Sequence, residues 1–318
     1  MFLALALSPC FARNPQSCAL QERESPKQAA TSTDQVKETS SQCGKYDLTQ
    51  IGRRGIGKGL NLYSYEREKK LGEKLSKRMD HSLTIIDDPL VSACLNRIAQ
   101  ALVHHSEVAY NISVTLIYNN EEVNAYSLPA GHLYVTTGLL LNMQSESELA
   151  MVMAHEIAHV AARHDTRTWT REILWGIPFF PILKVPGPIG YSAGQLSSAL
   201  SSLPVLKFDR DTEHEADLLG VQYAYSAGYD PQGMLDLYQR SADDDSRTSN
   251  FIVRLFNTHP SMKDRFNRAK AEISMFLPLQ EQYVLDTSEF QEAKQHLEDL
   301  VHDMERADKA SDPFVVTP

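Results

Sequence analysis

The segment His155-Glu156-Ile157-Ala158-His159 contains residue types whose spacing could support metal chemistry. Four residues is about one helical turn, so on a helix both imidazoles would leave the same face and could share one metal ion. Glu156 would be rotated away from the pair but would stay close enough to reach water held at the metal. The segment therefore predicts a metal site that could activate water for hydrolysis.

The residues around this segment favour the helix that such chemistry needs. Ser145 and Glu148 form a capping box, S-x-x-E, ahead of an apolar run. Two histidines in a largely buried helix would be costly unless their ring nitrogens were satisfied. Two ordinary core histidines are the alternative, but the setting favours the H-E-x-x-H motif of zinc peptidases. Apolar residues recur at helical spacing through the segment: Leu149, Val152, Met153, Ile157 and Val160.

A histidine is not expected as the third ligand. A catalytic zinc normally takes three protein ligands and leaves one position for water. The extended motif H-E-x-x-H-x-x-G-x-x-H is excluded, because Ala162 and Asp165 occupy its glycine and histidine positions. His164 lies five residues past His159 and is predicted to point away from the metal face.

A distant acidic segment supplies a better candidate for the third ligand. Glu213 and Asp217 stand at i and i+4 near the start of a predicted helix, so they share a face, whereas Glu215 points elsewhere. Glu213 would complete a set of two histidines and one glutamate, and Asp217 could accept the free ring N–H of a ligand histidine. An acidic helix start favoured by the helix dipole is the alternative. Beside H-E-x-x-H, the ligand interpretation is preferred.

Further motifs occur in a fixed order over residues of about 51–275. The first is Asn124-Ala125-x-x-x-Pro129-x-Gly131, followed by Tyr134-Val135-Thr136-x-Gly138-Leu139. The next two are His155-Glu156-x-x-His159 and the stretch from Glu213 to Asp217, which has Arg210 three residues before it. The last is Thr258-His259-Pro260-Ser261, with Arg265 beyond it. Together they resemble the zinc metallopeptidase family that includes the CAAX prenyl endopeptidases, the heat-shock protease HtpX and related soluble periplasmic proteases.

The resemblance implies a gluzincin fold with one zinc ion on His155, His159 and Glu213. It implies that Glu156 is the general base that activates water and that Asp217 orients a ligand. Because the flanking transmembrane helices of the membrane members have no counterpart in this sequence, prenyl-protein processing is not expected.

The segment from Asn124 to Val135 resembles the edge strand along which family members hold an extended peptide by main-chain hydrogen bonds. Where the family often has two glycines after the proline, this chain has Ala130-Gly131, which leaves the geometry of the turn open. The peptide-binding residues implied are Asn124, Ala125, Tyr126, Pro129 and Gly131.

Two further residues are implied near the reacting carbonyl. His259 resembles a residue that approaches the metal in related periplasmic enzymes, either to stabilise the transition state or to block the site. An exposed loop histidine is the alternative. Either Arg210 or His259 would donate to the oxyanion.

The expected fold class is α+β: a mainly helical zincin-like domain with a small β-sheet beside the active-site helix. We expect a signal-like and disordered segment over 1–50, a metallopeptidase domain over 51–280 and a helical C-terminal tail over 281–318. Hydrophobic periodicity predicts helices over residues 62–79, 90–103, 209–227, 231–241, 261–275 and 287–308. It predicts strands over residues 112–118, 123–128 and 133–137. The metal helix is expected to follow the last strand at once.

Charge and hydropathy bound the partners and the location. The formal charge of −10 argues against nucleic acid. Residues 173–206 are almost uncharged, but their prolines prevent a regular membrane helix. Two interpretations of this segment stay open. It is either a mobile loop that touches a membrane surface or unfolded substrate, or a buried connector. The apolar run at 1–7 resembles a clipped secretion signal, so a periplasmic or cell-envelope location is expected, with lipidation at Cys10 as an alternative.

The sequence thus predicts a zinc-dependent endopeptidase that acts on unfolded or extended polypeptides, such as misfolded or envelope proteins. A chaperone-like assembly factor with latent protease activity is the alternative from another class. A purely structural zinc is a third hypothesis, which predicts that chelation unfolds the protein. The oligomeric state stays open.

Overall fold

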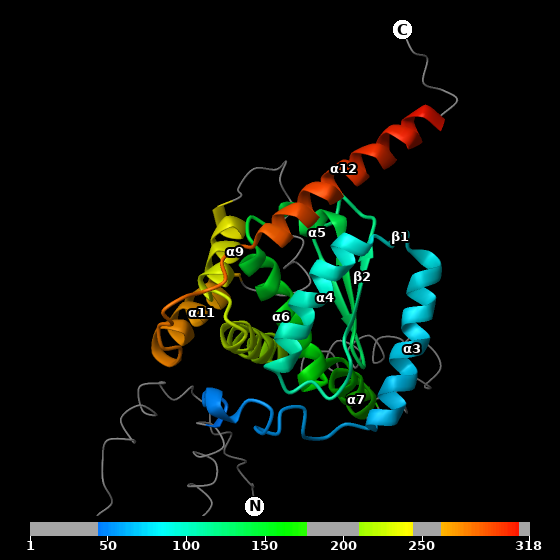
Figure 1. Ribbon diagram of the computed structural model, residues 1–318. Helices are drawn as coiled ribbons and strands as arrows, with labels where there is room; N and C mark the ends of the chain where they lie inside the picture. Colours follow the sequence, from blue (N-terminus) through cyan, green and yellow to red (C-terminus); the bar gives the residue numbers. More distant parts are fainter. Residues whose placement is uncertain (1–43, 177–209, 244–261, 312–318) are drawn as a thin grey trace, which may run out of the picture. The chain divides into compact units, whose positions relative to one another are not determined.

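A computed structural model describes residues 44–176, 210–243 and 262–311 (Figure 1). The chain divides into two compact units, residues 1–49 and residues 50–318. In the first unit the described residues contribute the start of a short 3-10 helix, η1 (Leu48–Gln50). All that follows concerns the second unit. Residues 1–43 of the predicted N-terminal segment lie outside the described residues, whereas η1 falls at its end.

The second unit is mainly helical with one small sheet, as the predicted α+β class requires. A further helix covers residues 210–226. The other elements are α3 (Tyr65–Ser82), β1 (Ile85–Ile86), α4 (Pro89–His104), β2 (Ser113–Ile117), β3 (Ala125–Leu128), β4 (His132–Thr136), α5 (Thr137–Asn142), α6 (Glu146–Ala162), α7 (His164–Gly176), α9 (Gln232–Asp243), α11 (Met262–Phe276) and α12 (Ser288–Ser311).

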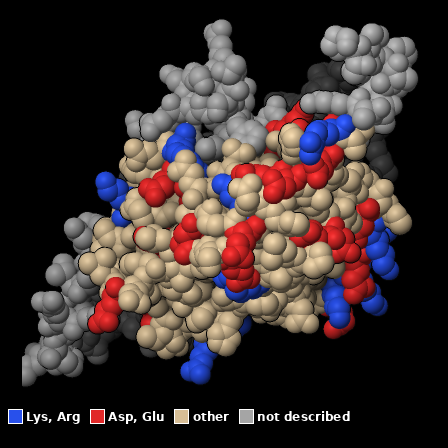
Figure 2. All heavy atoms as spheres, turned by 45° about the horizontal axis from the view of Figure 1, so that its top comes forward, with Lys and Arg blue, Asp and Glu red and all other residues tan. Residues whose placement is uncertain are grey.

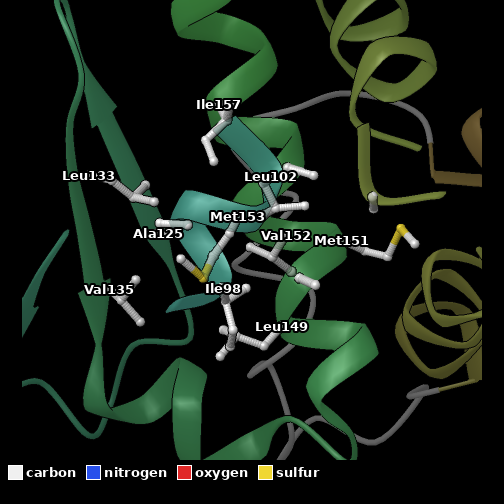
Figure 3. Close-up of a cluster of buried hydrophobic side chains, with 14 of the residues drawn as sticks. Ile98, Leu102, Ala125, Leu133, Val135, Leu149, Met151, Val152, Met153 and Ile157 are labelled. Atoms are coloured by element: carbon white, nitrogen blue, oxygen red, sulfur yellow. The ribbon is translucent and has the colours of Figure 1, made fainter. Parts of the chain in front are cut away.

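The sheet has the strand order β1-β2-β4-β3. The central pair β2 and β4 is parallel, whereas β1 and β3 pair antiparallel with their neighbours. Tyr134 in β4 points to α3, where its hydroxyl donates to Asp80 at 2.8 Å. Its neighbours Leu133 and Val135 point to the other face, which α4 and α6 cover (Figure 3). The segment 124–135 predicted as an edge strand therefore spans the edge strand β3 and most of the central strand β4.

Helix α6 is buried almost all round, which accounts for its apolar and alanine-rich sequence. The predicted capping box is confirmed: Ser145 Oγ accepts from the backbone N–H of Glu148 at 3.2 Å. The Glu148 carboxylate reaches back to the backbone N–H of Gln144 at 2.8 Å. The core around α6 draws on α4 and the sheet (Figure 3) and includes Ile98, Leu102, Ala125, Leu133, Val135, Leu149, Val152, Met153 and Ile157.

The turn between β3 and β4 answers the question left open by Ala130-Gly131. The backbone N–H of Gly131 donates to the carbonyl of Leu128 at 3.2 Å, which closes a four-residue turn. Ala130 has a φ of 66° and Gly131 a φ of 96°. A positive φ at the third position, after proline, is the geometry of a type II turn, which normally favours glycine. Ala130 therefore adopts the conformation that a first glycine would adopt more easily.

Gly72 allows α3 to lie directly against this turn. A Cβ atom at this position would be 1.9 Å from the carbonyl oxygen of Pro129. Helix propensity alone would make Gly72→Ala stabilising by about 1 kcal/mol. We expect the opposite sign, a loss of about 2 kcal/mol or more in the free energy of unfolding, because backbone must move to admit the methyl group. Urea unfolding measures this free energy. A stabilised Gly72→Ala variant would contradict the close approach of α3 to the carbonyl of Pro129.

Several elements differ from the sequence-based expectation. Helix α5 separates β4 from α6, so the expectation that the metal helix follows β4 at once was wrong. Helix α7 continues to Gly176, so residues 173–176 belong to a helix and not to the apolar loop. The remainder of that loop lies outside the described residues. Helix α12 buries Phe290, Ala293 and Leu297 in the core.

Candidate metal centre

The two histidines of α6 meet a helix from a distant part of the sequence. The 210–226 helix packs on α6 at Gly220, where a Cβ atom would lie 2.9 Å from the backbone nitrogen of His155. A side chain there would push the two backbones apart. The absence of a side chain lets Glu213, two turns earlier, reach the histidine pair.

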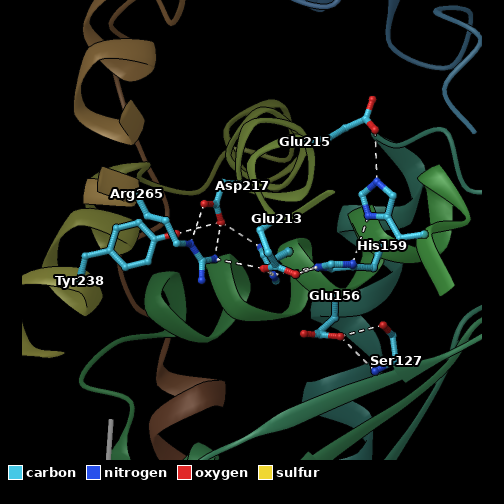
Figure 4. Close-up of polar contacts among 10 residues, drawn as sticks. Ser127, Glu156, His159, Glu213, Glu215, Asp217, Tyr238 and Arg265 are labelled. Atoms are coloured by element: carbon cyan, nitrogen blue, oxygen red, sulfur yellow. Dashed lines mark hydrogen bonds and ion pairs between the residues drawn. The ribbon is translucent and has the colours of Figure 1, made fainter. Parts of the chain in front are cut away.

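Three side chains converge on one point between these helices. His155 Nε2 lies 3.0 Å from His159 Nε2. The Glu213 carboxylate lies 3.4 Å from His155 Nε2 and 3.5 Å from His159 Nε2. Ligand atoms of these three residues all lie within 4.8 Å of one another. The structure thus brings together the three residues that the sequence predicts as metal ligands (Figure 4).

The donor set and its spacing fit a zinc ion. Tetrahedral zinc with Zn–N bonds of about 2.0–2.1 Å places two ligand nitrogens roughly 3.3 Å apart, close to the observed separations. Burial opposes a charged imidazole, yet the carboxylates of Asp217 and Glu213 outweigh it and raise the pKa of His155 to about 9. A site that stabilises a proton this strongly has the negative potential that a cation needs. Zinc must displace that proton when it binds.

Asp217 lies behind His155, on the side away from Glu213. Its Oδ1 is 3.0 Å from His155 Nδ1, so it contacts the ring nitrogen that faces away from the other ligands. Tyr238 donates to the same carboxylate at 2.9 Å, and Arg265 donates from Nε at 2.7 Å and from Nη2 at 2.5 Å. Burial alone would raise the pKa of Asp217, but Arg265 and His155 hold it well below its usual range. The carboxylate is thus ionised and fixed.

Glu156 faces the sheet. Its Oε2 accepts hydrogen bonds from the backbone N–H of Ser127 at 3.0 Å and from the Ser127 hydroxyl at 2.7 Å. Ser127 belongs to the edge strand β3, so the carboxylate lies between the metal ligands and that edge (Figure 4). Sequence reasoning did not find Ser127, because nothing local marks which residue of a strand will face a distant helix.

Two polar residues set aside by spacing also lie close to the site. His164 Nδ1 is 3.1 Å from His159 Nδ1, and His164 Nε2 is 3.2 Å from Glu215 Oε2. Neither residue belongs to the three-residue ligand cluster, as the spacing predicted. Arg265 appeared in the sequence only as a residue beyond a motif, and its place beside Asp217 could not be foreseen. Tyr238 was not identified at all.

Of the two predicted oxyanion donors, the structure describes only Arg210. Arg210 begins the 210–226 helix with an exposed side chain, and within the described residues it makes no hydrogen bond or ion pair. His259 lies outside the described residues. The oxyanion role of both stays a prediction.

The predicted peptide-binding residues follow β3 and its turn. Buried Asn124 directs its side-chain amide to Glu122 at 3.1 Å, and its side-chain oxygen accepts from the backbone N–H of Ala125 at 3.0 Å. The Tyr126 hydroxyl also donates to Glu122. These side chains support the strand. Pro129 and Gly131 form the turn at its end.

Acidic side chains are numerous on the face in Figure 2, with basic ones interspersed. This agrees with the formal charge of −10. No helix among the described residues has the length and apolar character needed to cross a membrane.

Comparison with known proteins agrees with this geometry. The chain is 29% identical to the beta-barrel assembly-enhancing protease of Yersinia pestis over 232 residues, which cover 70% of this chain and 47% of that protein. The Escherichia coli (strain K12) protein of the same name is 28% identical over 71% of this chain and 47% of its own. The chain spans about half the length of these curated relatives.

The mitochondrial metalloendopeptidase OMA1 of Arabidopsis thaliana is 34% identical over 151 residues, or 47% of this chain and 29% of that protein. Residues 89–273 match peptidase family M48, and this match includes every predicted site residue. The match confirms the predicted family. Because members of this family are metallopeptidases, it also confirms the predicted enzyme class, a zinc-dependent metalloendopeptidase, at the level of the family. This chain is a member of peptidase family M48.

Proposed function

We propose that this chain hydrolyses peptide bonds of extended or unfolded polypeptides in the cell envelope, with one zinc ion held by His155, His159 and Glu213. One observation carries the proposal. Glu156 lies beside three converging ligand side chains on one side and bonds to the edge strand β3 on the other. A peptide that pairs with this edge would accept from the Ser127 N–H in place of Glu156, which would leave the carboxylate beside the substrate and the ligands.

The chain's own residues divide the remaining work. Bound zinc would polarise the scissile carbonyl and lower the pKa of water. Glu156 would accept a proton from the attacking water and deliver it to the leaving nitrogen as the C–N bond breaks. Asp217 would keep the His155 ring in one tautomer and orientation. The edge of β3 that Glu156 contacts at Ser127 would hold the substrate in extended form.

The envelope location rests on the bacterial relatives, whose name refers to beta-barrel assembly. Residues 177–206 of the apolar loop are outside the described residues, so contact with a membrane surface stays a prediction. The same holds for lipidation and for the chaperone-like alternative.

Replacement of the third ligand tests the proposal. Glu213→Ala should lose most bound zinc and, with it, casein cleavage, because a catalytic zinc needs three protein ligands to hold it. Asp211→Ala is the matched control, since Asp211 is an exposed carboxylate one half-turn earlier on the same helix. Zinc content by mass spectrometry of metals and casein hydrolysis should both be unchanged in this control. Full zinc content in Glu213→Ala would refute the ligand set.

Chelation separates a catalytic from a purely structural zinc. A catalytic ion predicts that the chelated protein stays folded but inactive, and that activity returns with added zinc. Circular dichroism of the chelated protein distinguishes the two, since loss of the helical signal would favour the structural ion.

A further inference from the structure

His159 has two ring nitrogens, and each has a different neighbour. Nε2 faces His155 Nε2 at 3.0 Å and Glu213 at 3.5 Å, which is the metal side of the ring. Nδ1 faces His164 Nδ1 at 3.1 Å. His155 has the same division, because its Nδ1 faces Asp217. The second ligand thus meets an imidazole where the first meets a carboxylate.

The contact continues from His164 to a carboxylate. His164 Nε2 lies 3.2 Å from Glu215 Oε2 (Figure 4). Arg167 Nη1 lies 3.6 Å from the same oxygen. His164 is buried, with 2% of its surface exposed. The three residues His159, His164 and Glu215 therefore form a continuous polar chain that leads from the metal face toward the surface.

The backbone explains why a histidine five residues past the ligand reaches it. Helix α6 ends at Ala162, and its C-cap residue Arg163 adopts the left-handed conformation with a φ of 56°. The chain changes direction there, and α7 begins at His164. On a continuous helix the His164 ring would point away from His159. The reversal at Arg163 brings it back onto the ring of the ligand.

The positions of the protons follow from the geometry. If His159 binds the metal through Nε2, its proton must be on Nδ1. Nδ1 of His164 must then be the acceptor, so the His164 proton is on Nε2 and points to Glu215. The N–H of His159 thus donates to His164, and the N–H of His164 donates to Glu215. Because Glu215 accepts from Nε2–H of His164, the Nδ1 atom of His164 becomes a better acceptor for His159.

We infer that His164 and Glu215 are positioning residues that fix the tautomer and orientation of the metal ligand His159. This inference rests on the proposed function, because it requires zinc on His159 Nε2. Glu215 acts through an imidazole, whereas Asp217 contacts His155 directly. The two carboxylates on one helix thereby hold the two histidine ligands of α6, one each.

Zinc affinity tests the inference without reference to catalysis. The measurement is the zinc dissociation constant at pH 7, from competition with a chelator of known affinity. His164→Phe keeps a planar ring but has no nitrogen, and we expect it to weaken zinc binding about 10–100-fold. Glu215→Ala should weaken it in the same direction. Glu215→Gln retains an oxygen that accepts from His164, so its affinity should lie between those of Glu215→Ala and the wild type.

The matched control is His296→Phe. His296 Nε2 also pairs with a carboxylate, Asp88, at 2.9 Å. This pair lies on the surface, and both of its residues are outside the metal site. Its zinc affinity should stay within twofold of the wild type. Thermal unfolding of the metal-free proteins shows whether each variant is folded before its affinity is compared.

A spectroscopic arm separates positioning from general packing. Nitrogen-15 NMR of the zinc-loaded protein with labelled histidines reports which ring nitrogen of His159 carries the proton. We expect a protected Nδ1–H resonance in the wild type that shifts and exchanges faster in His164→Phe. An unchanged resonance, together with zinc affinity within twofold of the wild type, would overturn the inference.

The wild type and Glu213→Ala, measured in the same series, test the proposed function separately. If the wild type bound no zinc, both the proposed function and the inference would fall. If Glu213→Ala lost zinc as expected while His164→Phe did not, only the inference would fall.

Discussion

Glu156→Gln should retain its zinc and lose its peptidase activity by a factor of about 10²–10⁴. General acid–base catalysis by one positioned side chain is typically worth that much, and an amide cannot take up the proton of the attacking water. The substitution preserves shape. The amide oxygen of glutamine can still accept from the Ser127 N–H and hydroxyl, which hold Glu156 at 3.0 Å and 2.7 Å.

The measurement combines casein hydrolysis with zinc content and thermal stability of the same preparation. Glu172→Gln is the matched control, because it makes the same chemical change at an exposed position of α7. The control should match the wild type in all three readouts. Wild-type cleavage by Glu156→Gln would eliminate Glu156 as the base, whereas loss of zinc would mean that the substitution disturbed the site itself.

The metal helix and its ligands were predictable because local and chemical signals agree there. The capping box at Ser145, the apolar period and the histidine spacing all specify one helix with both imidazoles on one face. Glu213 could be proposed as a ligand because a two-histidine site needs a third one. Asp217 lies one turn later on the same face of the helix, so it could be proposed as a neighbour of the site. These inferences needed no knowledge of the tertiary structure.

Other parts of the site depend on where the chain changes direction. His164 lies off the metal face, as the spacing predicted, but its contact with Nδ1 of His159 was not predicted, because the spacing argument assumes a continuous helix and the left-handed Arg163 breaks it. The two-residue strand β1 and the six-residue helix α5 are too short to show a period in the sequence. Ser127 and Tyr238 enter the site through packing between distant elements, which no local pattern encodes.

Arg265 bears the second prediction of large effect, this time on stability. Its side chain is 1% exposed and donates twice to Asp217, and it also lies 3.9 Å from Glu213. Two buried carboxylates thus share this guanidinium, and among the described residues the protonated His155 is the other positive charge that contacts both when no metal is bound. Removal of one partner from such a pair leaves an uncompensated buried charge, which typically costs about 3–5 kcal/mol.

We therefore expect Arg265→Leu to lower the free energy of unfolding of the metal-free protein by about 3–5 kcal/mol in urea. Arg268→Leu is the matched control on the same helix, α11, since Arg268 is exposed and should change stability by less than about 0.5 kcal/mol. Adding Asp217→Asn to Arg265→Leu should recover part of the loss, because it removes one of the stranded charges. A loss of under about 1 kcal/mol for Arg265→Leu would show that Asp217 does not need this guanidinium, and that Tyr238 and His155 suffice to hold the carboxylate that orients the first metal ligand.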